Sequence, residues 1–167
     1  MTLEEFCAKY SAQPPRKPHG NASELRLLTA AEGVLRLNSP PAEAVIRASP
    51  VSSSDARHGK HLWVFFDSAI PYVLEAAPSA SPALASGVAK HTNLTGGAPA
   101  SSGGELWVDP ANANLLYVNG ASGRYGPTTL AQLEEVVGVF QERGFEVVSF
   151  GWDDDVGKPA RVLRHER

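Results

Sequence analysis

The sequence has one cysteine and no long apolar run, and each shortage excludes a class of protein. Cys7 is the single cysteine in 167 residues, so no disulfide can form within the chain, which fits a reducing compartment. The longest apolar runs, such as Leu62 to Phe66, fall far short of the ~20 residues that span a bilayer. We therefore expect no membrane-spanning helix and no membrane partner.

The chain also lacks an excess of positive charge. Its 15 Lys and Arg residues are interleaved with 18 Asp and Glu, which gives a net charge of −3. No long-range positive field would concentrate a phosphate backbone, so nucleic acid is not expected as a partner. The N-terminal residues have neither the basic start nor the apolar stretch of a secretory signal, and we expect a cytoplasmic protein.

The remaining composition is that of an ordinary globular protein. Hydrophobic residues make up 43% of the chain and charged residues 20%. A chain of this length buries roughly two-thirds of the surface that it exposes when unfolded, which is enough for one core. We expect one folded unit, with a helical N-terminal segment over residues 1–57 and an α+β core over residues 58–167.

Three helix-start signals predict that the N-terminal third is mostly helical. Thr2 with Glu5 forms a capping-box pattern, and Asn21 with Glu24 repeats it. Ser39 stands directly before a Pro-Pro pair, an arrangement typical of a third helix start.

From residue 61 the pattern changes to that of β-strands. Aromatic and β-branched residues at 62–66 and 72–74 predict one hairpin, and those at 105–108 and 115–118 predict a second. Residues 77–90, between the two hairpins, are mainly Ala, Ser and Pro. Such a segment has little apolar mass to bury, so we expect an exposed, mobile loop there.

One amphipathic helix is expected between Thr129, which caps it, and Gly144, which ends it. Strands at 145–152 and 160–163, separated by an acidic turn, are expected to follow. Antiparallel hairpins packed with one main C-terminal helix indicate the α+β class rather than a parallel, doubly wound fold.

Two polar motifs are the candidate functional site. His91-Thr-Asn-Leu-Thr-Gly-Gly97 precedes the second hairpin, and Ser122-Gly-Arg-Tyr-Gly-Pro127 follows it. The histidine can act as a general base or bind a ligand, or it can tie its loop to backbone carbonyls, and both interpretations stay open. The predicted binding residues are His91, Asn93, Thr95, Gly97, Arg124 and Tyr125, and the catalytic candidates are His91, Ser122, Arg124 and Tyr125.

The second motif has two interpretations. The Arg124 guanidinium would suit a carboxylate or a phosphate group of a ligand. Alternatively, the motif is a strand-to-helix turn in which Tyr125 packs on the core and Arg124 forms a local salt bridge. Metal and cofactor sites are not expected, because the histidines lack partners at metal-ligand spacing and the glycine-rich stretch 96–104 lacks the Lys-Ser/Thr ending of a phosphate-binding loop.

The order of these features is typical of one known family. Its pattern is a strand pair, His-Ser-Ser-Phe-Leu-x-Gly-Gly, a small-residue run before a strand, and Ser-Gly-His-Tyr-x-Pro before a helix. The matching segments are 63–73, 91–97, 104–108 and 122–127, in the same order. On these motifs the chain resembles an uncharacterised domain found in bacterial proteins and in the C-terminal part of plant IQ-motif calmodulin-binding proteins.

The chain departs from that pattern at two places. Thr92-Asn93 stands where the family has two serines, and Arg124 stands where it has the second histidine, so a two-histidine chemistry does not carry over. The sequence also has no Ile-Gln-x-x-x-Arg-Gly segment, so calmodulin binding does not carry over either. The resemblance implies a shared fold and site location, without a defined activity.

Two classes of function remain. The first is a binding or scaffold module that recognises a peptide or an anionic group of a partner protein, with a homodimer as a further expectation. It is favoured because Glu105 is the only acid near His91 in sequence. The composition, rich in Ala, Gly, Pro and Ser, favours a bacterial source, where we expect an accessory role in a peptide natural-product or effector pathway.

The alternative is a transferase or hydrolase, such as an ADP-ribosyl-transferase-like enzyme. In it His91 would be the base, Arg124 and loop amides would hold an anion, and Ser122 or Tyr125 would orient the substrate.

Overall fold

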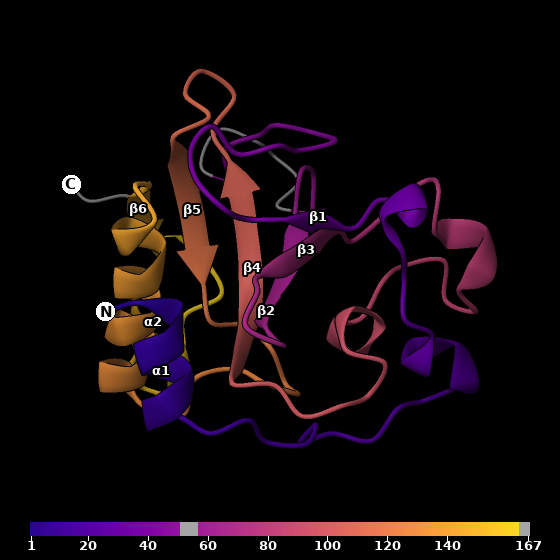
Figure 1. Ribbon diagram of the computed structural model, residues 1–167, viewed down its shortest axis with the longest axis horizontal. Helices are drawn as coiled ribbons and strands as arrows, with labels where there is room; N and C mark the ends of the chain where they lie inside the picture. Colours follow the sequence, from indigo (N-terminus) through magenta and orange to yellow (C-terminus); the bar gives the residue numbers. More distant parts are fainter. Residues whose placement is uncertain (51–56, 164–167) are drawn as a thin grey trace.

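A six-stranded mixed sheet forms the centre of the structure, a computed structural model that describes residues 1–50 and 57–163 (Figure 1). The strands follow the order β1-β3-β2-β4-β5-β6, and every neighbouring pair is antiparallel except β5 and β6. Their bounds are β1 Leu35–Arg36, β2 His61–Phe65, β3 Pro71–Leu74, β4 Ser102–Val108, β5 Leu115–Asn119 and β6 Glu146–Ser149. The chain is therefore of the mixed α+β class.

Both predicted hairpins are confirmed. β2 and β3 are joined by a tight turn in which Asp67 and Ser68 have φ angles of 52° and 58°. Two positive φ values match the right-handed twist of the strands, as in a type I′ turn. In the β4–β5 connection, Oδ2 of Asp109 accepts hydrogen bonds from the amides of Ala111 and Asn112, both at 2.9 Å.

The predicted C-terminal helix is confirmed as α2, Leu130–Glu142. Oγ1 of Thr129 accepts a hydrogen bond from the amide of Gln132 at 3.1 Å, which caps the first turn. Gly144, with φ of 102°, ends the helix in the left-handed region that glycine favours. α2 is the crossover that the parallel pair β5–β6 requires. Over residues 1–50 and 57–163, no helix is both long and apolar enough to cross a membrane.

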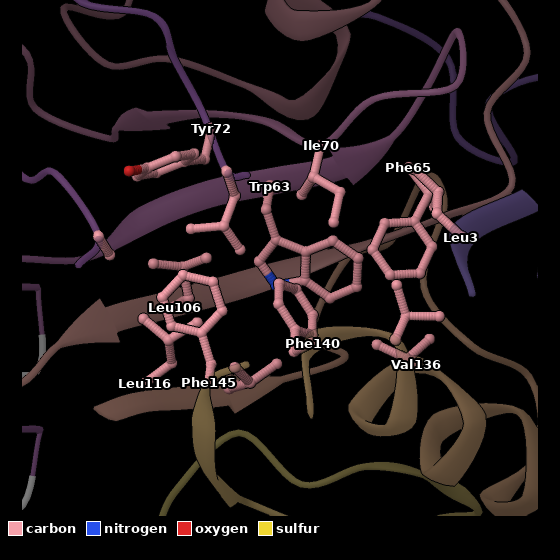
Figure 2. Packing of buried hydrophobic residues seen from close by; sticks show 14 of the residues in the cluster. Leu3, Trp63, Phe65, Ile70, Tyr72, Leu106, Leu116, Val136, Phe140 and Phe145 are labelled. Carbon is pink, nitrogen blue, oxygen red and sulfur yellow. The ribbon is translucent and has the colours of Figure 1, made fainter. Parts of the chain in front are cut away.

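The main core lies between α2, α1 (Leu3–Lys9) and one face of the sheet, and Figure 1 shows both helices on the same side. Figure 2 shows the indole of Trp63 at its centre, with the rings of Phe65 and Phe140 beside it. The ring centroids lie 4.9 Å and 5.2 Å from that of Trp63. These fully buried aromatic rings hold the helices to the sheet through dispersion and area burial.

The second face of the sheet is covered by irregular segments and short 3₁₀ turns. Leu62 and Val64 point to this face, because alternate residues of a strand face opposite ways. The expectation of an exposed loop at 77–90 is wrong in part. Ala77, Ala80, Leu84 and Ala89 are buried in this second core. Small side chains allow the chain to lie close against the sheet.

The prediction of a helical N-terminal third is wrong, because α1 is the only α-helix among residues 1–50. The signal at Asn21 and Glu24 produces one 3₁₀ turn, η1 (Ala22–Leu25), and a second turn, η2, spans Ala30–Glu32. No helix follows Ser39 within the described residues up to 50. Leu28 and Leu37 enter separate cores, so this segment does not present one apolar helix face to a single surface.

The C-terminal strands differ from the prediction in their bounds. Gly151, with φ of 75°, divides the expected strand 145–152 into β6 and the short β7, Trp152–Asp153. β7 pairs with β8, Lys158–Pro159, around the predicted acidic turn. The expected strand at 160–163 is wrong, because pairing ends at Pro159.

Candidate functional site

The two predicted motifs meet beside β4. The first contains the 3₁₀ turn η4, His91–Leu94, and the second follows β5. Oγ1 of Thr95 and the hydroxyl of Tyr125 lie 2.9 Å apart, and that hydroxyl also donates to the carbonyl of Ala98 at 2.8 Å. The motifs are thus joined directly through buried hydrogen bonds.

Two glycines of β4 make this close approach possible. A Cβ atom at Gly103 would lie 3.1 Å from Cβ of Tyr125 and 3.5 Å from the imidazole of His91. A Cβ atom at Gly104 would lie only 2.1 Å from the carbonyl oxygen of Asn119. Any larger residue at Gly104 would therefore push β5 away from β4.

Several predicted binding residues are engaged in internal contacts. The Asn93 side chain is fully buried, and its Nδ2 donates to the carbonyls of Ser23 and Arg26, both at 2.9 Å. Its Oδ1 accepts from the amide of Lys90 at 2.8 Å. Because its donors and its acceptor are all in use, Asn93 fixes η4 to the N-terminal segment.

Thr95, Gly97 and Tyr125 have a similar internal role. The amide of Gly97 donates to Oγ1 of Thr95 at 3.0 Å. Tyr125 is 2% exposed and belongs to the second core, and its amide donates to Oγ of Ser122 at 3.1 Å. These residues shape the loops, while His91, Ser122 and Arg124 line a common cleft.

Arg124 forms a buried ion pair with Glu24. Nη2 of Arg124 lies 2.5 Å from Oε1 of Glu24 and 3.5 Å from the carbonyl oxygen of Pro18. The other carboxylate oxygen, Oε2, accepts from the amides of Gly20 and Asn21 at 2.7 and 3.0 Å. Burial acts to raise the pKa of Glu24, but the hydrogen bonds from Arg124 and the two amides outweigh it and the pKa is lowered.

The interpretation of Arg124 as a salt-bridge residue is confirmed in part. The salt bridge exists, but its partner Glu24 lies 100 residues away and is not local. The guanidinium that was expected to hold a ligand's anion already holds a carboxylate of the chain itself. Its Nε atom is buried and has no hydrogen-bond partner among the described residues.

His91 lies at the wall of the cleft with a defined tautomer. Its Nε2 is 2.8 Å from the carbonyl oxygen of Gly104, and a carbonyl can only accept, so Nε2 carries the proton. Nδ1 then has the free lone pair, and it makes no hydrogen bond within residues 1–50 and 57–163. Burial lowers the pKa of His91, against the opposing effects of the Gly104 carbonyl and Glu105. The imidazole is therefore held neutral.

The cleft has a volume of about 500 Å³ and lies where η4, β4, the loop after β5 and the N-terminal segment meet. Among the described residues, its charged and polar lining residues are Lys17, Glu24, Glu75, Ser86, Lys90, His91, Glu105, Ser122, Arg124 and Arg161. Three carboxylates and four cations thus line one hollow.

Internal pairing decides which of these charges are free. Glu24 is paired with Arg124, and Glu105 lies 3.3 Å from Nζ of Lys60 and accepts from Asn119 at 3.0 Å. The remaining lining cations, Lys17, Lys90 and Arg161, form no ion pair within the described part of the chain. Glu75 is the one lining carboxylate without an ion pair among the described residues. Three unpaired cations and one unpaired carboxylate give the cleft a net positive unpaired charge.

The sequence indicated only part of this site. Glu24 is recognisable as a capping residue, but nothing local shows that it also binds Arg124. Lys17, Glu75 and Arg161 come from three separate segments and carry no motif. The free cations could be found only once the chain was folded.

No protein-family model matches the chain, and no curated protein or solved structure matches it. The resemblance drawn from the two motifs therefore remains a prediction. Among the described residues, no group of three or more His, Cys, Asp or Glu side chains is placed to hold a metal ion.

Proposed function

We propose that this chain is a binding module whose cleft takes an anionic group of a peptide or partner protein. The observation that carries the proposal is the unpaired positive charge of Lys17, Lys90 and Arg161 around one hollow. Cations that lack an internal partner are free to pair with a ligand's carboxylates, and they also steer an acidic partner toward the cleft.

The wall of the cleft adds directional contacts to this charge. Nδ1 of His91 is an acceptor and would bind a donor such as a peptide N–H. The Glu24–Arg124 pair holds the N-terminal segment against the second motif, so the cleft exists before the ligand arrives. A preformed site loses less conformational freedom on binding.

Charge reversal tests this proposal. Fluorescein-labelled peptides rich in Asp and Glu, and matched peptides with Asn and Gln instead, would be titrated into the protein and followed by fluorescence anisotropy. We expect saturable binding of the acidic peptides, weakened about tenfold or more by Lys90→Glu and by added salt. Arg36→Glu is the matched control, since Arg36 is exposed on β1 and is not a residue of the cleft. Equal binding of both peptide sets, or an equal effect of Arg36→Glu, would count against the proposal.

A second candidate function is catalysis with His91 as the general base, as in a transferase or hydrolase of the ADP-ribosyl-transferase-like kind. It is favoured by one observation: the neutral imidazole presents an unused Nδ1 in a cleft that also contains Ser122 and Glu105. His91→Gln keeps a donor to the Gly104 carbonyl and removes the base. Turnover of NAD⁺ or of an activated ester by the wild-type protein, lost in this variant, would support catalysis. No turnover by the wild type would leave the binding module as the better hypothesis.

A homodimer is also part of the proposal. β6 is at one edge of the sheet and pairs with β5 on its inner side. An edge strand can add to the sheet of a second copy. Light scattering after size exclusion would measure the mass, and a monomer at all concentrations tested would remove this part.

A further inference from the structure

A second hollow adjoins the cleft on the other side of the loop at 120–123. It has a volume of about 340 Å³, and we call it the basic pocket. Its walls are this loop, Arg16 from the N-terminal segment, Lys158 of β8, and Arg161. Residues 121–123 of the loop and Arg161 also line the cleft, so the two hollows are neighbours with a common wall.

The basic pocket differs from the cleft in its charge. Among the residues that the structure describes, Arg16, Lys158 and Arg161 are its charged lining residues, and none of its lining residues is an acid. Within the described residues none of the three cations forms an ion pair. Three positive charges around one small hollow repel each other unless an anion lies between them. A dianion suits this arrangement better than a single carboxylate.

The walls of the basic pocket are rigidly packed. A Cβ atom at Gly120 would lie 2.8 Å from Cδ of Pro127 and 3.1 Å from Cγ of Pro159, so the loop, the turn before α2 and β8 are in close contact. Arg16 is held in place because its Nη2 donates to the carbonyl of Gly126 at 2.5 Å. Its remaining guanidinium donors make no hydrogen bond to any other described residue and can donate to a ligand.

Of the amides of residues 121–123, only that of Gly123 has no hydrogen-bond partner within the described chain. The amide of Ala121 donates to Oδ1 of Asn119 at 2.9 Å, and that of Ser122 donates to the carbonyl of Gly120, also at 2.9 Å. The amide of Gly123, a residue of both hollows, makes no hydrogen bond within the described chain. A free amide beside guanidinium and ammonium groups can donate to a phosphate oxygen.

We infer that the basic pocket is a binding site for a phosphomonoester dianion. Arg16, Lys158 and Arg161 supply the charge, and the loop at 120–123 supplies a rigid wall. The inference does not require the proposed function, because Arg16 and Lys158 line the basic pocket and not the cleft, and only Arg161 lines both. Such a dianion can belong to a phosphorylated side chain or to a nucleotide, and the two sources are separated in the experiment.

The experiment is a titration of the ¹⁵N-labelled full chain followed by amide chemical shifts. The probes are O-phospho-L-serine, adenosine monophosphate and inorganic phosphate, with N-acetyl-aspartate as a carboxylate control. We expect saturable shifts at the amides of 120–123 with the phosphate compounds. Lys158→Ala should weaken this binding about tenfold, the factor for one charge-assisted hydrogen bond. Lys158 is exposed, so the variant is expected to fold, and its amide spectrum shows whether it has.

Lys90→Ala is the matched control, because Lys90 lines the cleft but not the basic pocket. Lys90→Ala should leave phosphate binding unchanged and weaken the binding of the acidic peptides. Lys158→Ala should weaken phosphate binding and leave the binding of the acidic peptides unchanged. The two proposals can therefore fail separately. A preference for phosphoserine or for adenosine monophosphate supports the site and identifies the source. The inference is overturned if the wild type shows no saturable shift, if N-acetyl-aspartate binds as tightly, or if Lys90→Ala weakens phosphate binding as much as Lys158→Ala.

Discussion

His61, at the start of β2, should make the protein less stable as the pH falls below about 6.5. The side chain is fully buried, and its Nδ1 lies 2.8 Å from the carbonyl oxygen of Gly59. Nδ1 therefore carries the proton, and Nε2 is a buried acceptor with no partner among the described residues. Protonating Nε2 would place a charge in the interior.

The magnitude follows from the pKa. Burial lowers the pKa of His61 from 6.5 to about 4, against the opposing effect of the Gly59 carbonyl. The unfolded chain takes up the proton near pH 6.5, whereas the folded protein takes it up only near pH 4. Above pH 6.5 His61 is neutral in both states and does not lower the free energy of unfolding. That free energy then falls progressively as the pH drops from 6.5 to about 4. At about 1.4 kcal/mol for each pH unit, the loss is about 3 kcal/mol.

The assay is urea unfolding between pH 7.5 and 4, followed by the fluorescence of the three tryptophans. His91 and Glu24 also have lowered pKa values, so the wild-type curve alone does not isolate His61. His61→Asn supplies the comparison, because its Nδ2 can replace Nδ1 as donor to the Gly59 carbonyl but does not titrate. We expect the wild type to lose about 3 kcal/mol more than this variant over the range. Parallel curves for the two proteins would refute the reasoning.

Two further predictions concern the candidate site. Glu24→Ala leaves Arg124 buried without its carboxylate, which should lower the free energy of unfolding in urea by about 3 to 5 kcal/mol. Replacing both residues by methionine should recover most of this loss. No recovery in the double variant would show that the unpaired charge is not the cause. Tyr125→Phe removes the hydroxyl that bonds Ala98 and Thr95, so the free energy of unfolding should fall by about 1 kcal/mol, and an unchanged midpoint would contradict these contacts.

The local elements could be predicted because their signals are local. The hairpin β2–β3 has a continuous apolar run and a tight turn, and α2 has its cap, its apolar face and its terminal glycine within 16 residues, Thr129 to Gly144. The N-terminal third could not be predicted in this way. Capping boxes fix where a turn begins, but a helix continues only if one face finds a surface to pack on.

One feature of the sequence indicates that a second core exists. An uninterrupted apolar run such as 62–66 is typical of a strand buried on both faces, so something had to cover each side. The Ala-rich residues 77–90 supply part of that cover. Their composition resembles that of a mobile loop, and only the neighbouring sheet turns their small side chains into buried contacts.

The sequence by itself determined both hairpins and α2, and it indicated the two polar motifs. The tertiary structure alone decided which charges are free. Arg124, the expected anion holder, is neutralised by Glu24, while Lys17, Lys90 and Arg161 around the cleft form no ion pair with any residue that the structure describes. The physical reason is that ion pairing depends on distances of a few ångströms between segments up to 100 residues apart, and such distances exist only after the chain has folded.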